Sequence, residues 1–179
     1  MRIIGGLAKS RRVRMDQRLE IRPISDRVKQ SLFDILMYDI TGARFLDLFA
    51  GSGAVGIEAL SRGAKEAVFI DSDGRCANLT RKNLNELGFR NSLVLLSDSF
   101  KAVENFKQQG QTFDLIFVDP PYEKDLVEKT LKTLKDNDIL TKKGYIIVKR
   151  HKKELLGDYF TKFDERKYGD TILTFVRKK

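Results

Sequence analysis

Cysteine and histidine are nearly absent from this sequence. Among its 179 residues there is one of each, Cys76 and His151. A single cysteine excludes an intramolecular disulfide, and the two residues together cannot supply the common zinc-ligand spacings, so we expect no metal site. One histidine also argues against Cys-His or Ser-His catalysis. Cys76 falls in a predicted helix and His151 in a basic cluster, where a structural role is the simpler interpretation.

Long apolar runs are missing as well. No run approaches the ~20 residues needed to cross a bilayer, and Met1–Gly6 lack the apolar stretch of a secretory signal. Hydrophobic residues make up 41% and charged residues 33% of the chain, as in an ordinary globular protein. We therefore expect one cytoplasmic domain over residues 1–179, monomeric and without a membrane segment.

Acidic residues are outnumbered. The chain has 25 Asp and Glu against 34 Lys and Arg, a net charge of +9. An N-terminal arm over residues 1–22 carries seven of the basic residues against two acidic ones, and further clusters lie at 149–153 and 177–179. Such clustering suits a polyanionic partner, because each neutralised phosphate releases counterions. A solvated basic surface remains the alternative.

Short apolar runs alternate with stretches of helical pattern from residue 44 onward. Continuous apolar runs between helices are what a parallel sheet buried on both faces requires. Before them, Ser25 can cap a helix whose apolar residues recur at helical spacing. The five runs predicted as strands are Phe45–Phe49, Ala67–Ile70, Leu93–Leu96, Phe113–Val118 and Tyr145–Val148.

The last section of the chain has a different pattern. Tyr159–Tyr168 and Thr171–Arg177 read as two strands joined by Gly169-Asp170, a tight-turn dipeptide. The sequence therefore predicts an α/β fold: a doubly wound, mostly parallel seven-stranded sheet closed by a C-terminal antiparallel hairpin. Ligands of such a sheet bind at the carboxyl ends of the strands.

A glycine-rich turn follows the first predicted strand. Gly51, Gly53 and Gly56 match G-x-G-x-x-G, and Asp71 follows the second strand where a ribose-binding carboxylate would lie. The pattern by itself also fits a nicotinamide dehydrogenase. Asp47, at the mouth of the turn, would repel a pyrophosphate but attract the ammonium group of S-adenosylmethionine, and glycines let the backbone approach the methionine moiety.

We therefore predict an S-adenosylmethionine site. Asp71 can accept both ribose hydroxyls, and Asp98, after the third strand, can accept from the adenine amino group. A plain helix cap is the alternative for Asp98. The predicted cofactor-binding residues are Asp47, Phe49, Ala50, Gly51, Ser52, Gly53, Asp71, Ser72, Asp98, Ser99 and Asp119.

The fourth predicted strand ends in the tetrapeptide Asp119-Pro120-Pro121-Tyr122. The prolines stiffen the backbone, which holds the Asp119 side chain and the Pro120 carbonyl in fixed directions. Two acceptors so placed can bind both hydrogens of an exocyclic amine and turn its lone pair toward a methyl donor. Tyr122 offers a flat surface on which a base can stack. We predict that these four residues form the catalytic site, without a metal or a covalent intermediate.

The whole chain resembles the bacterial family of small-subunit ribosomal RNA guanine-N2 methyltransferases. The resemblance implies a Rossmann-like class I methyltransferase fold with a small N-terminal β-hairpin. It also implies N2 methylation of one guanine in 16S-type RNA within a partly assembled subunit. Ser10, Ile24, Gln30 and Asp71 depart from residues common in the family. The segments that carry the resemblance are Met1–Gly6, Arg22–Val28, Asp47–Gly53, Glu58–Ala64, Phe69–Asp71 and Asp119–Tyr122.

With an RNA substrate in view, the basic arm becomes the expected phosphate-binding segment. The weak hydrophobic alternation over residues 7–18 predicts little contribution to the core, which leaves the arm free for RNA. The predicted RNA-binding residues are Lys9, Arg11, Arg12, Arg14, Arg22 and Arg27. Three alternatives stay open: a DNA adenine-N6 methyltransferase, a protein glutamine methyltransferase and a catalytically silent RNA-binding assembly factor.

Overall fold

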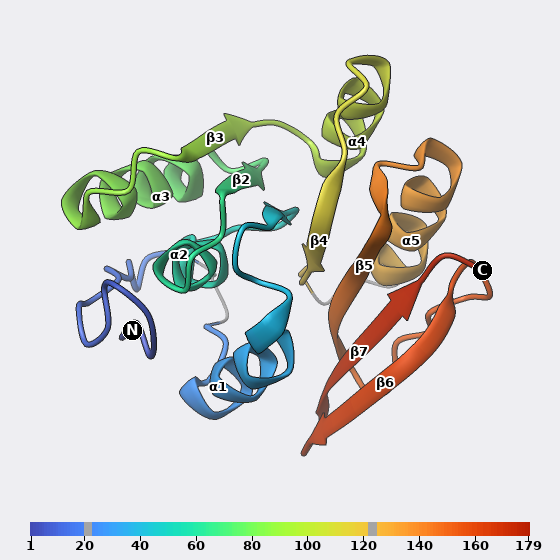
Figure 1. Cartoon of the computed structure of the whole chain (residues 1–179), viewed down its shortest axis with the longest axis horizontal. Helices are drawn as coiled ribbons and strands as arrows, with labels where there is room; N and C mark the ends of the chain where they lie inside the picture. The colour runs from blue at the N-terminus through green and yellow to red at the C-terminus, as the bar shows by residue number, and fades with distance from the viewer. Residues whose placement is uncertain (20–22, 122–124) are drawn as a thin grey trace.

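A computed structural model describes residues 1–19, 23–121 and 125–179 of the chain (Figure 1). A seven-stranded sheet runs through it in the order β3-β2-β1-β4-β5-β7-β6. Neighbouring strands from β3 to β5 pair in parallel, and β7 pairs antiparallel with both β5 and β6. The strands are β1 (Arg44–Asp47), β2 (Glu66–Asp71), β3 (Ser92–Leu96), β4 (Phe113–Val118), β5 (Leu140–His151), β6 (Thr161–Tyr168) and β7 (Thr171–Arg177).

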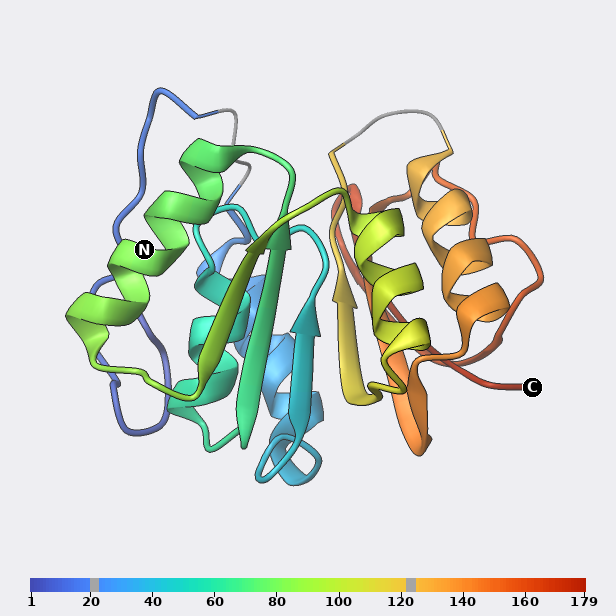
Figure 2. The ribbon, with the colours of Figure 1, turned by 90° about the horizontal axis from the view of Figure 1, so that it is seen from above.

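Helices cover both faces of the sheet, and each face has its own hydrophobic core. Side chains of α1, α2 and α3 share one core cluster, and side chains of α4 and α5 share the other. In Figure 2, α4 and α5 run side by side. The helices are α1 (Asp26–Ile35), η1 (Leu36–Tyr38), α2 (Ala54–Ser61), α3 (Gly74–Leu87), α4 (Ser99–Gln108) and α5 (Leu126–Asn137).

Local sequence explains where these elements begin and end. The Ser25 hydroxyl accepts from the backbone N–H of Val28 and caps α1, as the sequence predicts. The central strands are apolar runs buried on both faces, and the interior residues of β4 are almost wholly buried. β1 ends two residues earlier than predicted, at Asp47, and β5 is much longer than its predicted core, Tyr145–Val148.

The C-terminal hairpin matches its prediction closely. β6 and β7 pair from Thr161↔Arg177 to Tyr168↔Thr171, and Gly169 has a φ of 61° in the turn between them. Because a positive φ carries no steric cost for glycine, this residue permits the tight turn. The hairpin lies at the edge of the sheet beyond β5 (Figure 1).

The N-terminal arm folds back on itself as a short hairpin-like turn. One antiparallel bridge joins Arg2 to Arg12, and the Ile3 N–H donates to the Arg11 carbonyl. Contrary to the prediction that residues 7–18 add little to the core, Ala8 and Val13 are buried in it. Their periodicity is weak because the arm follows a turn rather than a regular strand.

A buried ion network holds the arm against the domain. The Glu58 carboxylate on α2 accepts from the backbone N–H groups of Ile4 and Gly5, both at 2.8 Å. Its charge is balanced by Lys29, 3.4 Å away, and Arg62, 2.8 Å away. Glu58 and Lys29 are fully buried, so the network fixes the arm beside α1 and α2.

Candidate active site

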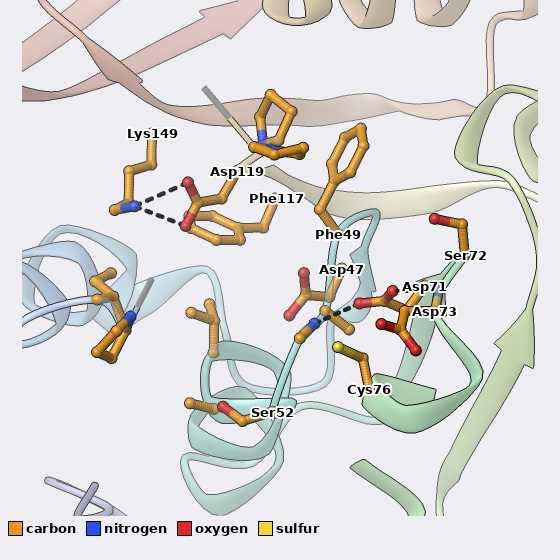
Figure 3. A pocket seen from close by; sticks show the side chains of 18 of the residues that line it. Asp47, Phe49, Ser52, Asp71, Ser72, Asp73, Cys76, Phe117, Asp119 and Lys149 are labelled. Atoms are coloured by element: carbon orange, nitrogen blue, oxygen red, sulfur yellow. Dashed lines mark hydrogen bonds and ion pairs between the residues drawn. The ribbon is translucent and has the colours of Figure 1, made fainter. Parts of the chain in front are cut away.

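The strand order reverses between β1 and β4, and a cavity opens at the carboxyl ends of these strands. Ligands of doubly wound sheets bind at this topological switch point. The cavity has a volume of about 870 Å³. β1 and β4 pair with Asp47 opposite Phe117, so both residues point to the same face and Asp119 follows two residues farther on. Figure 3 shows Asp47, Asp71 and Asp119 around this cavity.

The glycine-rich turn lines the cavity and is tied to two other segments. The backbone N–H of Gly51 donates to Asp71 Oδ2 at 2.8 Å, and the Gly51 carbonyl accepts from Thr80 Oγ1 at 2.9 Å. The Ser52 carbonyl accepts from Asn83 Nδ2 at 2.9 Å. The turn is therefore held in place from the end of β2 and from α3.

Two of the predicted fingerprint glycines are required by geometry. Gly53 has a φ of 77°, and a Cβ there would lie 2.7 Å from Thr80 Cγ2. A Cβ on Gly56 would lie 2.3 Å from Phe69 Cε1. Gly53 therefore permits the turn, and Gly56 permits close packing of α2 on β2.

Asp47 is almost completely buried, with 1% of its surface exposed. Burial, followed by the nearby charge of Asp119, raises its pKa from 3.8 to about 7, although backbone N–H groups of Gly56 and Phe49 act in the opposite direction. Among the described residues, its Oδ1 atom has no hydrogen-bond partner. A buried carboxylate oxygen without a partner is costly, and a bound ammonium group would satisfy it.

Asp71, at the end of β2, accepts one backbone hydrogen bond on each oxygen. Oδ2 accepts from Gly51 and Oδ1 from the backbone N–H of Asp73, at 2.9 Å. Burial raises the pKa of this carboxyl, and the backbone hydrogen bonds oppose that shift. Each oxygen keeps a further lone pair, so Asp71 can also accept from a pair of hydroxyls.

Asp119 follows β4 and is paired with Lys149 from β5. The Lys149 Nζ lies 2.8 Å from each of the two Asp119 oxygens (Figure 3). Pro120 and Pro121 line the same cavity. The catalytic aspartate of the sequence prediction therefore lies in the same cavity as Asp47 and the glycine turn, and it carries a cation that the sequence did not assign to it.

Most of the predicted cofactor residues gather at this cavity, and three do not line it: Gly53, Asp98 and Ser99. The Asp98 carboxylate caps α4 by accepting from the N–H groups of Phe100 and Lys101, and the Ser99 hydroxyl donates to the Leu48 carbonyl. The predicted residues that line the cavity are Asp47, Phe49, Ala50, Gly51, Ser52, Asp71, Ser72, Asp119, Pro120 and Pro121.

Two of the predicted RNA-binding residues, Arg11 and Arg14, bind another part of the chain. The Arg11 guanidinium donates to the carbonyls of Leu87 and Glu86 at the end of α3, and Arg14 pairs with the Glu86 carboxylate at 2.6 Å. Lys9, Arg12 and Arg27 are exposed. Two further predicted site residues, Arg22 and Tyr122, lie outside the described residues.

Three basic residues of the cavity wall were missed by the sequence reasoning. Arg18 and Arg75 line the cavity, and their guanidinium groups pair with Asp16 and Asp73 respectively. The sequence places Lys149 in a basic cluster that suits a polyanionic partner, with a solvated surface as the alternative, but both Lys149 and Arg150 are buried. The signal for Lys149 was its place directly after the fifth apolar run, the position that corresponds to Asp119 after the fourth.

Metal-ligand clusters and membrane-spanning helices are both absent from the described part of the chain. Among residues 1–19, 23–121 and 125–179, no group of three or more His, Cys, Asp or Glu side chains is arranged to hold a metal ion. No helix in the same ranges is both long and apolar enough to cross a membrane.

Known proteins resemble this chain over most or all of its length. The family described as Conserved hypothetical protein 95 matches residues 1–177. The chain is 32% identical to "Putative rRNA methyltransferase YlbH" of Bacillus subtilis (strain 168), with all of both proteins aligned. It is 39% identical to "Ribosomal RNA small subunit methyltransferase D" of Escherichia coli (strain K12), over 83% of this chain and 73% of the relative. The solved structure "Putative methyltransferase yhhF from Escherichia coli" has a TM-score of 0.87 at 32% identity and covers 100% of this chain and 98% of its own.

Proposed function

This chain belongs to the Conserved hypothetical protein 95 family of methyltransferases, and from that premise we propose that it transfers a methyl group from S-adenosylmethionine to the N2 amine of a guanine in small-subunit (16S) ribosomal RNA. One observation carries the proposal. A single cavity joins a buried, partly unsatisfied carboxylate beside a glycine turn to the aspartate of an Asp-Pro-Pro sequence. The first part suits the cofactor, and the second suits an amine.

The cofactor's cationic and polar groups fit the residues of the cavity. The Asp47 Oδ1 atom lacks a partner within the described part of the chain, and a positively charged amino group would supply one. Asp71 offers acceptors for ribose hydroxyls. The backbone of Gly51, which lines the cavity, permits close approach. When bound, S-adenosylmethionine supplies an electrophilic methyl group.

In this proposal, Asp119 is the group that binds the target amine. Its carboxylate accepts one N–H of the amine, and the Pro120 carbonyl accepts the other, so that the nitrogen lone pair faces the methyl donor. Methylation would form the new N–C bond as the methyl–sulfur bond of the cofactor breaks, so that S-adenosylhomocysteine would leave. The nitrogen would then give up one proton, which the ionised Asp119 carboxylate can accept and pass to water. In this proposal Tyr122, which lies outside the described residues, would stack on the base.

The basic surface of the arm supports an RNA substrate. Lys9, Arg12 and Arg27 are exposed, and we propose that they contact phosphates near an unstacked guanine. Arg11 and Arg14 already have partners on α3, so a phosphate would have to replace those contacts. We propose further that the protein acts on the partly assembled subunit, as a cytoplasmic monomer and without a metal.

Methyl transfer to RNA from cells that lack this protein tests the function. Small-subunit particles and the naked 16S-type RNA from such cells are incubated with the protein and isotope-labelled S-adenosylmethionine, and the digested nucleosides are analysed by mass spectrometry. We expect labelled N2-methylguanosine, at one position. Asp119→Ala should lower turnover by ~10²–10³ and change cofactor affinity much less, because Asp47 and the glycine turn are retained.

Other products would identify the alternatives. Labelled N6-methyladenosine in DNA, with none in RNA, would replace this proposal by a DNA methyltransferase. Tight RNA binding with no methyl transfer to either nucleic acid would indicate an assembly factor. The arm is tested separately by the salt dependence of RNA binding: loss of Lys9 and Arg12 should lower the slope by about 0.7–0.9 per lost contact, and Arg11→Ala serves as the comparison.

A further inference from the structure

The end of β5 places a lysine directly beside the aspartate of the Asp-Pro-Pro sequence. β4 and β5 pair in parallel with Val118 opposite Val148. The next residue of each segment is Asp119 and Lys149, so the two side chains leave the sheet as neighbours on one face. The result is an ion pair in which Nζ is 2.8 Å from both carboxylate oxygens.

This pair differs from the exposed ion pairs of the molecule. The Lys149 side chain is 7% exposed and the Asp119 side chain 17%, whereas the nearby Lys152–Asp170 pair is 55% and 66% exposed. Charged groups are rarely buried unless they are paired. Arg150 points to the other side of β5, where it pairs with Glu165, so strand alternation directs only Lys149 toward the cavity.

The cavity brings four described carboxylates together, which makes a buried cation important. Asp119 is faced by Asp47 from β1 and, farther along the cavity wall, by Asp71 from β2 and by Asp73, which is paired with Arg75. The negative charges of Asp47 and Asp119 repel each other. Among the described residues of the wall, the two other cationic side chains, Arg18 and Arg75, are 89% and 71% exposed and are screened by water. Of these three described cations, Lys149 is therefore the one placed to stabilise a negative charge on Asp119.

The ion pair with Lys149 takes up part of the hydrogen-bonding capacity of Asp119. A carboxylate offers about four lone-pair positions on its two oxygens. The Lys149 ammonium contacts each oxygen once. The ion pair also fixes the direction of the carboxylate before any substrate arrives, which lowers the cost of ordering it during reaction.

We propose that Lys149 is a positioning residue for methyl transfer: its ammonium keeps the Asp119 carboxylate ionised and oriented, so that Asp119 can accept a hydrogen bond from the target amine at neutral pH. The role rests on the proposed function, in which Asp119 meets the amine. Lys149 acts through Asp119.

Two substitutions separate the charge of Lys149 from its bulk. Lys149→Met removes the ammonium and keeps an unbranched side chain, and Lys149→Arg keeps a cation and its donors. Lys152→Met is the matched control, because it removes an exposed lysine three residues away. An opposite charge within about 4–6 Å moves the titration of a carboxyl by ~1–3 pH units, so the expected effect is large enough to measure.

The first measurement needs no substrate. The ¹³C resonance of the Asp119 carboxyl, assigned by its loss in Asp119→Asn, is followed by NMR from pH 3 to pH 9. We expect its midpoint to rise by at least one pH unit in Lys149→Met and to stay within about half a unit of wild type in Lys149→Arg and Lys152→Met. An unchanged midpoint in Lys149→Met overturns the proposal.

The second measurement connects the ion pair to turnover. Initial rates of methyl transfer to RNA are measured against pH at saturating S-adenosylmethionine, so that titration of Asp47 in the free cofactor site does not limit the rate. In Lys149→Met the acidic limb of kcat should move to higher pH by at least one unit, so that the loss of rate relative to wild type is greatest at acidic pH and is recovered as pH rises toward 9. A uniform loss at every pH would show a merely structural role and overturn the proposal.

Failure of the proposed function would look different. If wild type methylates no RNA, the guanine-N2 assignment fails, whereas the carboxyl titration still decides whether Lys149 holds Asp119 ionised. Cofactor affinity, measured by calorimetry, should be nearly unchanged in Lys149→Met, since Asp47, Asp71 and the glycine turn lie on other strands.

Discussion

Replacing Asp47 by asparagine should stabilise the cofactor-free protein at neutral and alkaline pH and weaken its binding of S-adenosylmethionine. Asp47 is 1% exposed, and its Oδ1 atom has no hydrogen-bond partner in the ranges that the structure describes. Its pKa is raised from 3.8 to about 7 by burial and by the charge of Asp119. Asparagine has nearly the same shape but never acquires the charge, so the substitution isolates the cost of ionising this buried group.

The sign and size of the effect follow from linkage. The unfolded chain loses the Asp47 proton near pH 3.8 and the folded protein near pH 7, so in this interval the folded protein binds more protons. The free energy of unfolding therefore falls as pH rises from about 4 to about 7. At ~1.4 kcal/mol per pH unit, the interval of roughly three units corresponds to an upper limit of about 4 kcal/mol. The amide group of asparagine has hydrogen-bond requirements of its own, which reduce this upper limit. We therefore expect the free energy of unfolding of Asp47→Asn to exceed that of wild type by ~2–4 kcal/mol at pH 8.

Urea unfolding of both proteins at pH 4, 6, 7 and 8, without cofactor, measures this difference. The two free energies of unfolding should nearly agree at pH 4 and separate as pH rises, with the variant more stable. Asp98→Asn is the matched control: Asp98 is an exposed cap of α4, and asparagine caps helices as well as aspartate does. A difference between Asp47→Asn and wild type that is the same at every pH would refute the reasoning.

Calorimetry supplies the functional half of the same prediction. An ammonium group beside Asp47 favours the ionised carboxylate, so cofactor binding by wild type near pH 7 should release a fraction of a proton, detected as a dependence of the binding heat on the buffer. That proton release should be absent in Asp47→Asn. The variant should also bind ~10-fold or more weakly, since hydrogen bonds to charged groups contribute about 1.5–3 kcal/mol.

Three further predictions test the supports of the site. Gly56→Ala places a methyl group 2.3 Å from Phe69 and should destabilise by ~1–3 kcal/mol, seen as a drop in Tm of roughly 2–4 °C per kcal/mol; an unchanged Tm would show that the helix shifts freely. Glu58→Gln leaves the buried Lys29 without its counter-charge and should cost ~3–5 kcal/mol in urea unfolding, and a loss below 1 kcal/mol would contradict the importance of the network. Arg14→Ala removes an exposed ion pair and should change stability by less than about 1 kcal/mol, whereas a larger loss would mean that the arm is anchored mainly from α3.

The sequence by itself determined the order of helices and strands and the two aspartates, Asp47 and Asp119, that the cavity brings together. Each central strand was visible because burial on both faces requires a continuous apolar run, as in Phe113–Val118. Asp47 and Asp119 were found because each lies immediately after or at the end of such a run, where a parallel sheet exposes its ligand site. Gly53 and Gly56 were found because the spacing of the glycines reflects two local requirements: a positive φ at Gly53 and the absence of a Cβ at Gly56.

Only the tertiary structure decided which charged residues work in pairs. The basic residues Arg11, Lys149 and Arg150 read alike in the sequence, yet Arg11 binds the end of α3, Lys149 binds Asp119 and Arg150 binds Glu165. Asp98, for which the sequence left both a cofactor contact and a helix cap open, caps α4. Local patterns report a residue's own burial and backbone, but partners fifteen or more residues away are set by strand register and by the path of the arm, and these are properties of the assembled sheet.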